Sequence, residues 1–158
     1  MNDHQRGYNY YEEHAADVTL GDITSCGRSK QTLKWLHDGT GDPCLNITRQ
    51  ISLSLGSLEV VSHFTFSKCN DLGWLGYFIG KCEHLRELVL DGSPEDEDGE
   101  EEEQRILHAL SDGISRNQSI QRVFIQRLSN NGLNTIARAL GKMTQLERLI
   151  LSDYLRSE

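Results

Sequence analysis

The sequence predicts an α/β domain in which short parallel strands alternate with helices. An apolar pattern, Leu-x-x-Leu-x-Leu with any aliphatic or aromatic residue at the leucine places, occurs four times, starting at Val61, Leu85, Ile120 and Leu146. These starts are 24, 35 and 26 residues apart, lengths that suit one strand, one helix and two connections per unit. The segments between the copies have helical apolar spacing, so strand and helix alternate.

Each strand is predicted by the second half of the pattern. Leu88 and Leu90 are two residues apart, as on one face of a strand, and Leu85 lies in the turn that enters it. Two other copies contain continuous apolar triplets, Val123–Ile125 and Leu149–Leu151, which favour buried parallel strands. The competing fold is an amphipathic helical bundle, with Leu-x-x-Leu as half a heptad. The predicted strands lie near residues 61–66, 87–91, 121–126 and 147–151.

Three helices are predicted between these strands, each with one apolar face. The predicted faces are Leu72, Leu75, Ile79 and Cys82; Ile106, Leu107, Leu110 and Ile114; and Leu133, Ile136, Ala137 and Leu140. Asn130–Gly132 supplies turn and capping residues before the third helix, and Arg116–Asn117 ends the second where a residue that tolerates the left-handed conformation is useful.

The rest of the chain divides by composition. Residues 1–30 are polar and carry no repeat, so we expect a flexible or loosely docked N-terminal segment. Residues 31–57 contain a weak copy at Leu33 and Leu36, and a strand-like alternation of Ile51, Leu53 and Leu55. We interpret them as a degenerate repeat or an N-terminal cap. The repeats occupy residues 58–158, with an acidic insertion at 93–103.

The repeated motifs resemble those of leucine-rich-repeat proteins of the ribonuclease-inhibitor-like class, which have a helix in every repeat. Cys69 follows the copy at Val61 where that family has Asn or Cys, whereas the later copies have Ser93, Leu128 and Tyr154 there. The resemblance covers residues 58–155 well. It implies a solenoid with a concave parallel sheet and helices on the convex side, and a non-enzymatic module that binds a protein partner on the concave face.

Residues that alternate with the core positions would line this concave face in three columns. The middle column, Thr65, Val89, Phe124 and Ile150, is apolar, which is typical of protein-binding surfaces. One flanking column is His63, Glu87, Arg122 and Arg148; the other is Ser67, Asp91, Gln126 and Ser152. The predicted partner-binding residues are Glu87, Val89, Arg122, Phe124, Arg148 and Ile150. The alternatives are that another part of the chain covers the strip, or that the register differs.

The acidic run Pro94–Glu103 does not match a calcium-binding loop. With Gly99 at the sixth place of an EF-hand loop, Pro94 and Arg105 fall at the first and twelfth ligand places, where carboxylates are needed. We expect a solvated loop whose glutamates reach a helix N-terminus, where the helix dipole favours them. An acidic-loop divalent-cation-dependent sensor or enzyme is the alternative function.

Other functional classes find little support in the sequence. The net charge of −8 opposes nucleic-acid binding, and no apolar run is long enough to span a membrane. No P-loop, Gly-x-Ser-x-Gly or HExxH motif occurs, so we expect no enzyme, no cofactor and no metal site. Four cysteines without a CxxC pair or a secretory signal suggest free thiols in the cytoplasm, with the nucleus as an alternative location.

The last copy of the pattern is followed by only seven residues. These are too few for the helix and cap that would cover it, so its strand is expected to be an exposed edge. We therefore expect either a longer native protein or a dimer or partner contact at residues 146–155. In the alternative, Tyr154 and Leu155 fold back as a small lid.

Overall fold

The computed structural model describes residues 7–25, 27–41, 43–48, 62–65, 72–91 and 97–152. Its centre is a five-stranded sheet in which every neighbouring pair of strands is parallel. The strands are β1 (Cys44–Thr48), β2 (Ser62–Thr65), β3 (Glu87–Asp91), β4 (Arg122–Gln126) and β5 (Arg148–Ser152), in the spatial order β2-β1-β3-β4-β5.

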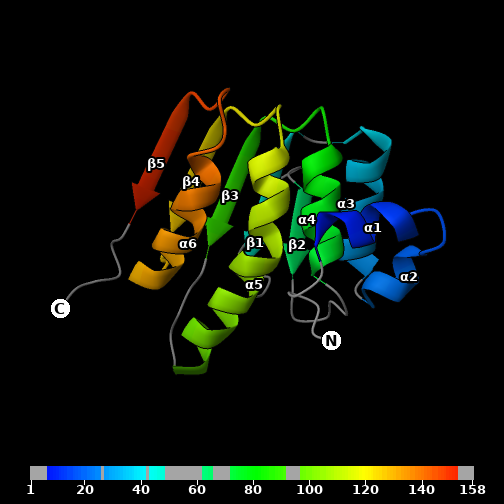
Figure 1. The fold of residues 1–158 in the computed structure, drawn as a ribbon, viewed down its shortest axis with the longest axis horizontal. Helices are drawn as coiled ribbons and strands as arrows, with labels where there is room; N and C mark the ends of the chain where they lie inside the picture. The colour runs from blue at the N-terminus through cyan, green and yellow to red at the C-terminus, as the bar shows by residue number, and fades with distance from the viewer. Residues whose placement is uncertain are drawn as a thin grey trace.

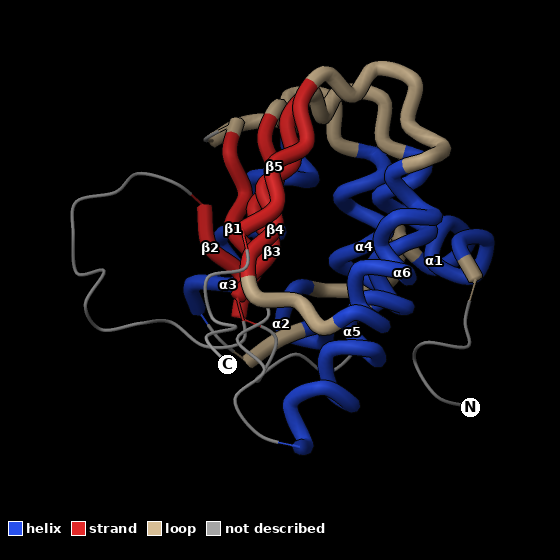
Figure 2. The backbone as a smooth tube through the Cα atoms, turned by 90° about the vertical axis from the view of Figure 1, so that its left-hand side faces the viewer, coloured by secondary structure: helices blue, strands red, loops and turns tan. Residues whose placement is uncertain are grey.

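The described helices are α1 (Tyr8–His14), α2 (Leu20–Ile23), α3 (Gly27–Asp38), α4 (Gly73–Lys81), α5 (Glu97–Arg116) and α6 (Asn130–Leu140). Helices α4, α5 and α6 form a layer on one face of the sheet, and α1 packs on the outside of that layer (Figures 1 and 2). Helix α3 lies beside β2, at the end of the sheet opposite β5 (Figure 1). None of the described helices covers β3, β4 and β5 on the other face (Figure 2). The result is an α/β fold with one face of the sheet covered.

All four predicted strands are present at the expected positions, and three of them are consecutive neighbours in the sheet. The order at the other end differs from a sequential stack, because β1 lies between β2 and β3. Leu45 and Ile47 of β1 pair in register with Leu88 and Leu90 of β3, and all four are buried. This alignment joins two apolar faces, which explains why β1 occupies the place next to β3. The predicted alternation of Ile51, Leu53 and Leu55 lies outside the described residues.

The predicted apolar helix faces are largely confirmed. All four predicted residues are buried in α4 and its two cap positions, and all four are buried in α5. In α6, Ile136 and Leu140 are buried and Leu133 is partly buried, but Ala137 is exposed, which corrects the predicted face. Ala139 is buried in its place. The side chain of Ser129 caps α6 by accepting from the Gly132 N–H at 3.0 Å, so the helix begins one residue after its cap, at Asn130.

Helices α4 and α5 cross at glycines. A Cβ added to Gly113 of α5 would overlap the carbonyl group of Gly76 in α4, and a Cβ on Gly76 would approach the Ala109 carbonyl oxygen to 2.7 Å. A Cβ on Gly80 would lie 3.0 Å from the Gly113 carbonyl oxygen. The two backbones are therefore in direct contact, and any side chain at Gly113 would force them apart.

The described part of the N-terminal segment, residues 7–25, packs against the rest of the fold. Tyr11 of α1 is buried and packs edge-on against Trp74 at a ring-centroid distance of 4.8 Å. Ile23 of α2 is also fully buried. The expected boundary between residues 30 and 31 falls inside α3, so this part of the chain does not divide there.

The acidic segment also differs from the expected loop. Helix α5 begins at Glu97, so seven residues of the predicted insertion, 97–103, are in its first turns. Helical backbone at this point agrees with the expectation that glutamates occupy a helix N-terminus, where the partial positive charge favours carboxylates. The described part of the chain has no helix long and apolar enough to cross a membrane.

Candidate interaction surface

One face of β3, β4 and β5 is not covered by any described helix and is called the uncovered face below (Figure 2). It carries three rows of side chains, each row running across the strands. The pairing of β3, β4 and β5 aligns Glu87 with Arg122 and Arg148, and Asp91 with Gln126 and Ser152. Between these rows, the same register aligns Val89, Phe124 and Ile150. The three columns predicted from the sequence are thus correct for β3, β4 and β5.

The middle row is apolar and accessible to solvent. Val89 and Phe124 are partly buried, and Ile150 is 38% exposed. On the same strands the residues of the opposite face, such as Leu88 and Val123, are almost fully buried against the helices. The alternation of burial therefore separates a core face from an accessible apolar row, as a half-covered sheet requires.

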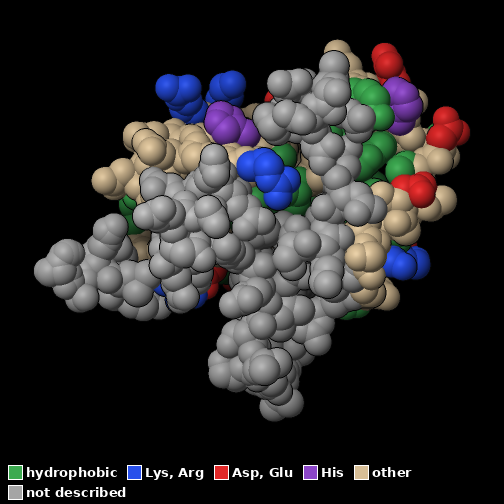
Figure 3. All heavy atoms as spheres, turned by 90° about the horizontal axis from the view of Figure 1, so that it is seen from below, with side chains coloured by type: hydrophobic (Ala, Val, Ile, Leu, Met, Phe, Trp, Pro, Cys, Tyr) green, Lys and Arg blue, Asp and Glu red, His purple; other side chains and the backbone are tan. Residues whose placement is uncertain are grey.

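The row on one side of this apolar row is charged. Arg122 Nε lies 3.5 Å from Glu87 Oε2, with both side chains more than a third exposed. Arg148, at the end of the row on β5, is exposed, and no ion pair is recorded for it among the described residues. The view from below shows most of the visible Asp and Glu side chains toward the end of the molecule that contains α1–α3 (Figures 1 and 3). Arg122 and Arg148 lie on β4 and β5, toward the other end of the sheet (Figure 1).

The carboxyl ends of the strands are joined by an arginine that the sequence analysis did not identify. Arg127 follows β4 with φ of 56°, a left-handed conformation that is unfavourable for arginine. Its Nε donates to Asp91 Oδ1 at 2.8 Å and its Nη2 to Asp91 Oδ2, forming a bidentate ion pair. Its backbone N–H donates to the Ser152 carbonyl oxygen at 3.3 Å. Arg127 therefore links the carboxyl ends of β3 and β5. These strand ends form one margin of the face that carries the three rows, which is the candidate surface.

The predicted columns are wrong for β2. Its residue His63 pairs with Asn46 of β1, and Asn46 pairs with Val89, so His63 aligns with the apolar row and not with the charged row. By the same register Thr65 aligns, through Thr48, with Asp91. Ser67 lies outside the described residues. The shift arises because β1 intervenes, and no leucine-rich motif in residues 44–48 signals that strand.

The opposite margin of the sheet is formed by the loops that enter the strands. Asn117, the residue after α5, is buried and donates through Nδ2 to the carbonyl oxygens of Ile79 at 2.7 Å and Cys82 at 3.1 Å. Its Oδ1 accepts from the backbone N–H groups of Ser119 and Ile120, both at 2.7 Å. Asn117 has no positive φ, because Arg127 is the one such non-glycine residue among those described. Its role is to link two loops, and not to adopt the expected left-handed conformation.

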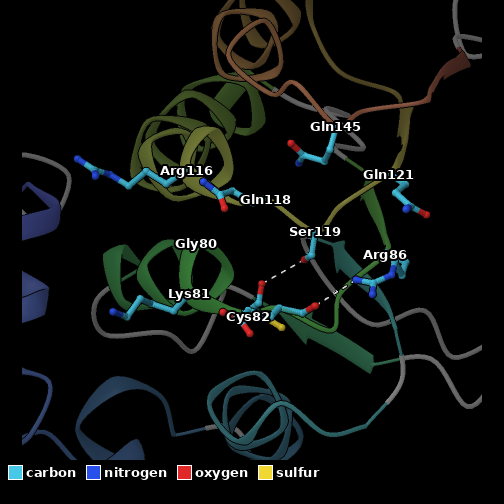
Figure 4. A pocket seen from close by; sticks show the side chains of 10 residues that line it. Gly80, Lys81, Cys82, Arg86, Arg116, Gln118, Ser119, Gln121 and Gln145 are labelled. Atoms are coloured by element: carbon cyan, nitrogen blue, oxygen red, sulfur yellow. Dashed lines mark hydrogen bonds between the residues drawn. The ribbon is translucent and has the colours of Figure 1, made fainter.

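A polar cleft of about 570 Å³ opens between these loops (Figure 4). Its lining includes Arg86, Ser119, Gln121 and Gln145, while the Lys81 and Arg116 side chains extend away from the other labelled side chains. Both of those cations have partners elsewhere. Lys81 Nζ lies 3.4 Å from Glu12 Oε1, and the Arg116 guanidinium lies over the Tyr8 ring at 4.1 Å. These contacts hold α1 against α4 and α5 and leave few free charges for a ligand in the cleft.

Cys82 also lines the cleft, and its Sγ lies 2.9 Å from Nδ1 of His84, which is not part of the lining. Burial raises the pKa of the Cys82 thiol, although hydrogen bonds from backbone N–H groups at His84 and Leu85 oppose this rise. A nucleophilic cysteine needs the opposite shift, toward the thiolate. Cys82 is therefore better explained as the small buried hydrophobe that its place in the pattern predicts.

No protein-family model and no curated protein matches this chain. The geometry of the surface is consequently the basis for assigning a function. Within the described segments, no group of three or more His, Cys, Asp or Glu side chains has an arrangement that could hold a metal ion.

Proposed function

We propose that the chain is a non-enzymatic interaction module that binds a protein partner on the uncovered face of its sheet. The observation that carries this proposal is the accessible apolar row of Val89, Phe124 and Ile150 beside a row of charged side chains. Protein-binding surfaces commonly combine an apolar centre with a polar rim. The partner-binding residues that we propose are Glu87, Val89, Arg122, Phe124, Arg148 and Ile150.

We further propose that the module is a short leucine-rich-repeat array of the ribonuclease-inhibitor-like class. Three features support this proposal: the recurring strand pattern, the helices on one face, and the consecutive order of β3, β4 and β5. Cys82, Asn117 and Met143 each stand three residues before the first apolar residue of a copy, and all three are buried. The position of β1 is a departure from a strictly sequential array.

Within the proposed surface, Phe124 is the expected anchor. It lies on the strand between the other two apolar residues, and aromatic side chains near the centre of an interface often dominate binding energy. Arg122 and Arg148 stand in the neighbouring row, where partly solvated charges contribute more to orientation and association rate than to affinity. Replacing Phe124 by alanine should weaken partner binding by about 1 to 4 kcal/mol.

The test is affinity capture from cell extract followed by mass spectrometry, with four forms of the chain compared in parallel. These are the unmodified chain, Phe124→Ala, Arg148→Ala and the matched control Arg138→Ala. Arg138 is an exposed arginine on α6, on the covered side of the sheet. We expect a protein captured by the unmodified chain and by Arg138→Ala to be depleted with Phe124→Ala, and to a lesser extent with Arg148→Ala.

The captured protein is then purified and its affinity for each variant measured by calorimetry. Equal affinity for the Phe124→Ala variant and the unmodified chain would show that the partner binds elsewhere, and the proposed surface would be rejected. Loss of binding with Arg138→Ala alone would move the interface to the helix layer. The melting temperature of each variant is recorded to separate loss of binding from loss of fold.

A further inference from the structure

Strand β5 is the outermost strand of the sheet and exposes a short run of apolar side chains. Leu149 is 45% exposed, Ile150 38% and Leu151 57%. Among the described residues, β4 is the one strand that pairs with β5. In Figure 1, α6 lies in front of β4 and leaves β5 at the open end of the sheet. An uncovered apolar edge of this kind favours pairing with another strand.

The direction of the backbone groups on β5 follows from its pairing with β4. The Arg148 N–H donates to the Gln121 carbonyl oxygen at 3.1 Å, and the Ser152 carbonyl oxygen accepts from the Arg127 N–H. Arg148 and Ser152 therefore direct their backbone groups toward β4, and Ile150, midway between them, shares that direction. The backbone N–H and C=O groups of Leu149 and Leu151 consequently face the open edge.

We propose that β5 pairs antiparallel with β5 of a second copy of this chain, about a twofold axis that passes through Ile150. In this register Leu149 of each copy lies opposite Leu151 of the other. These are the residues whose backbone groups face the edge, so both pairs form the two-hydrogen-bond arrangement of an antiparallel ladder. The four leucines meet on the helix side of the sheet, and the two Ile150 residues meet on the other side.

The charge pattern of β5 is compatible with this arrangement. Arg148 of one copy faces Ser152 of the other, so no two like charges are placed opposite each other. A twofold axis through Leu149 or Leu151 would also align the backbone groups that face the edge. Either axis, however, would leave part of β5 unpaired. The axis at Ile150 pairs all five residues and places all three exposed apolar side chains against those of the second copy.

The dimer also extends the surface assigned to partner binding. Since Ile150 meets its own symmetry mate, the row of Val89, Phe124 and Ile150 continues directly into the same row of the second copy. The result is one ten-stranded sheet with an apolar row across its uncovered face. The dimer itself does not depend on the proposed function, because the pairing uses the edge of β5 and not the face at Phe124.

The first experiment is disulfide trapping in the full chain under mild oxidation. In an antiparallel pair, residues of the Ile150 type, which do not hydrogen-bond to each other, have Cα atoms about 4.5 Å apart, within disulfide range. Ile150→Cys should therefore form a covalent dimer. Arg148→Cys tests the register, because its symmetry mate is about four residues away along the ladder, roughly 13 Å.

Phe124→Cys tests whether the two copies pair through their β5 edges and not through their sheet faces. It lies in the same row, but three strand spacings, about 14 Å, would separate the two copies. The unmodified chain measures any cross-linking through its four native cysteines. Trapping with Ile150→Cys above these three controls supports the proposal. Equal trapping with Arg148→Cys, or no trapping with Ile150→Cys, overturns it.

The second experiment is sedimentation across a range of protein concentrations, which needs no cross-link. The unmodified chain should sediment as a dimer that dissociates on dilution. Leu151→Glu should raise the dimer dissociation constant at least about tenfold, because it places a carboxylate among the leucines. Gln118→Glu adds the same charge at an exposed loop position and should have no such effect.

A monomer at every concentration would overturn the proposal, as would a dimer that Leu151→Glu leaves intact. In either case the edge would belong to another segment or to a different protein. The capture experiment with Phe124→Ala is unaffected by that result, so the failure of the dimer and the failure of the proposed function can be told apart.

Discussion

The same sequence pattern gives strands whose core-facing side chains are fully buried in the middle of the sheet and a strand whose core-facing side chains are exposed at its end. Leu88 and Leu90 of β3 are 0% and 2% exposed, and Val123 and Ile125 of β4 are 1% and 2% exposed. Their register partners in β5, Leu149 and Leu151, are about half exposed. Since the residue types and the spacing are alike, the difference arises from what surrounds each strand.

The comparison separates two kinds of information in the sequence. The spacing of the pattern specifies a strand and which side chains share one face, and this holds for β3, β4 and β5 alike. Burial additionally requires a neighbour on each side and a helix above, which β3 has and β5 lacks among the described residues. The burial of a strand in this sheet therefore depends on its neighbours as well as on its own sequence.

The largest effect expected from this difference is on the free energy of unfolding. Leu88→Ala should lower it by about 2 to 5 kcal/mol, because the deletion leaves a cavity in a packed core. Leu149→Ala should lower it by less than about 1 kcal/mol, because the side chain is already half solvated. Urea denaturation of both variants, below the concentration at which any dimer forms, measures the two values. Similar losses would show that the two strands are equally buried in solution.

The loops before the strands show a second contrast within the pattern. Asn117 forms four hydrogen bonds to backbone groups in its own loop, in the last turn of α4 and in the loop before β3. Cys82 and Met143 occupy the equivalent places with apolar or weakly polar side chains. Asn117→Ala should cost about 2 to 4 kcal/mol, since it leaves backbone groups near Ser119 and Ile120 without partners. Gln118→Ala, at the exposed neighbouring position, should change stability by less than about 0.5 kcal/mol. If thermal unfolding shows the same loss of stability for both variants, Asn117 does not have the linking role.

The helix layer gives the next prediction. Gly113→Ala should destabilise the protein by about 1 to 3 kcal/mol, because the added methyl group meets the α4 backbone and not a movable side chain. Gly141, just after α6, is a matched control: its backbone is right-handed and an added Cβ would lie 3.4 Å from the nearest atom. Gly141→Ala should be neutral or stabilise by up to about 1 kcal/mol. Calorimetry of both variants checks whether Gly113→Ala lowers the melting temperature while Gly141→Ala leaves it unchanged or raises it.

Much of the fold was predictable because its signals are local. The period-two spacing of Leu88 and Leu90 and the helical spacing around Leu110 each depend on residues a few positions apart.

The features that were missed depend on distant partners. Strand β1 has no leucine-rich motif, and its place between β2 and β3 is set by pairing across the sheet. The ion pair of Arg127 joins residues 36 positions apart, and nothing local marks an arginine with positive φ. Tyr11 is one of three tyrosines, with Tyr8 and Tyr10, in a polar segment without an apolar period, so its burial against Trp74 had no periodic signal. Local patterns thus identified the candidate surface, whereas its margins required the tertiary structure.

The last predicted change in stability concerns the candidate surface itself. Phe124 and Ile125 are adjacent in β4, but Phe124 lies on the uncovered face and Ile125 points into the core. Ile125→Ala should lower the free energy of unfolding by about 2 to 5 kcal/mol. Phe124→Ala should lower it by about 1 kcal/mol or less, since the removed ring is partly solvated and leaves no closed cavity. Denaturant titration of the two variants tests both the alternation of faces and the use of Phe124 as a binding probe. If Phe124→Ala proved the more damaging of the two, the assignment of inner and outer faces would be reversed, and the proposed partner surface would have to be sought on the other side of the sheet.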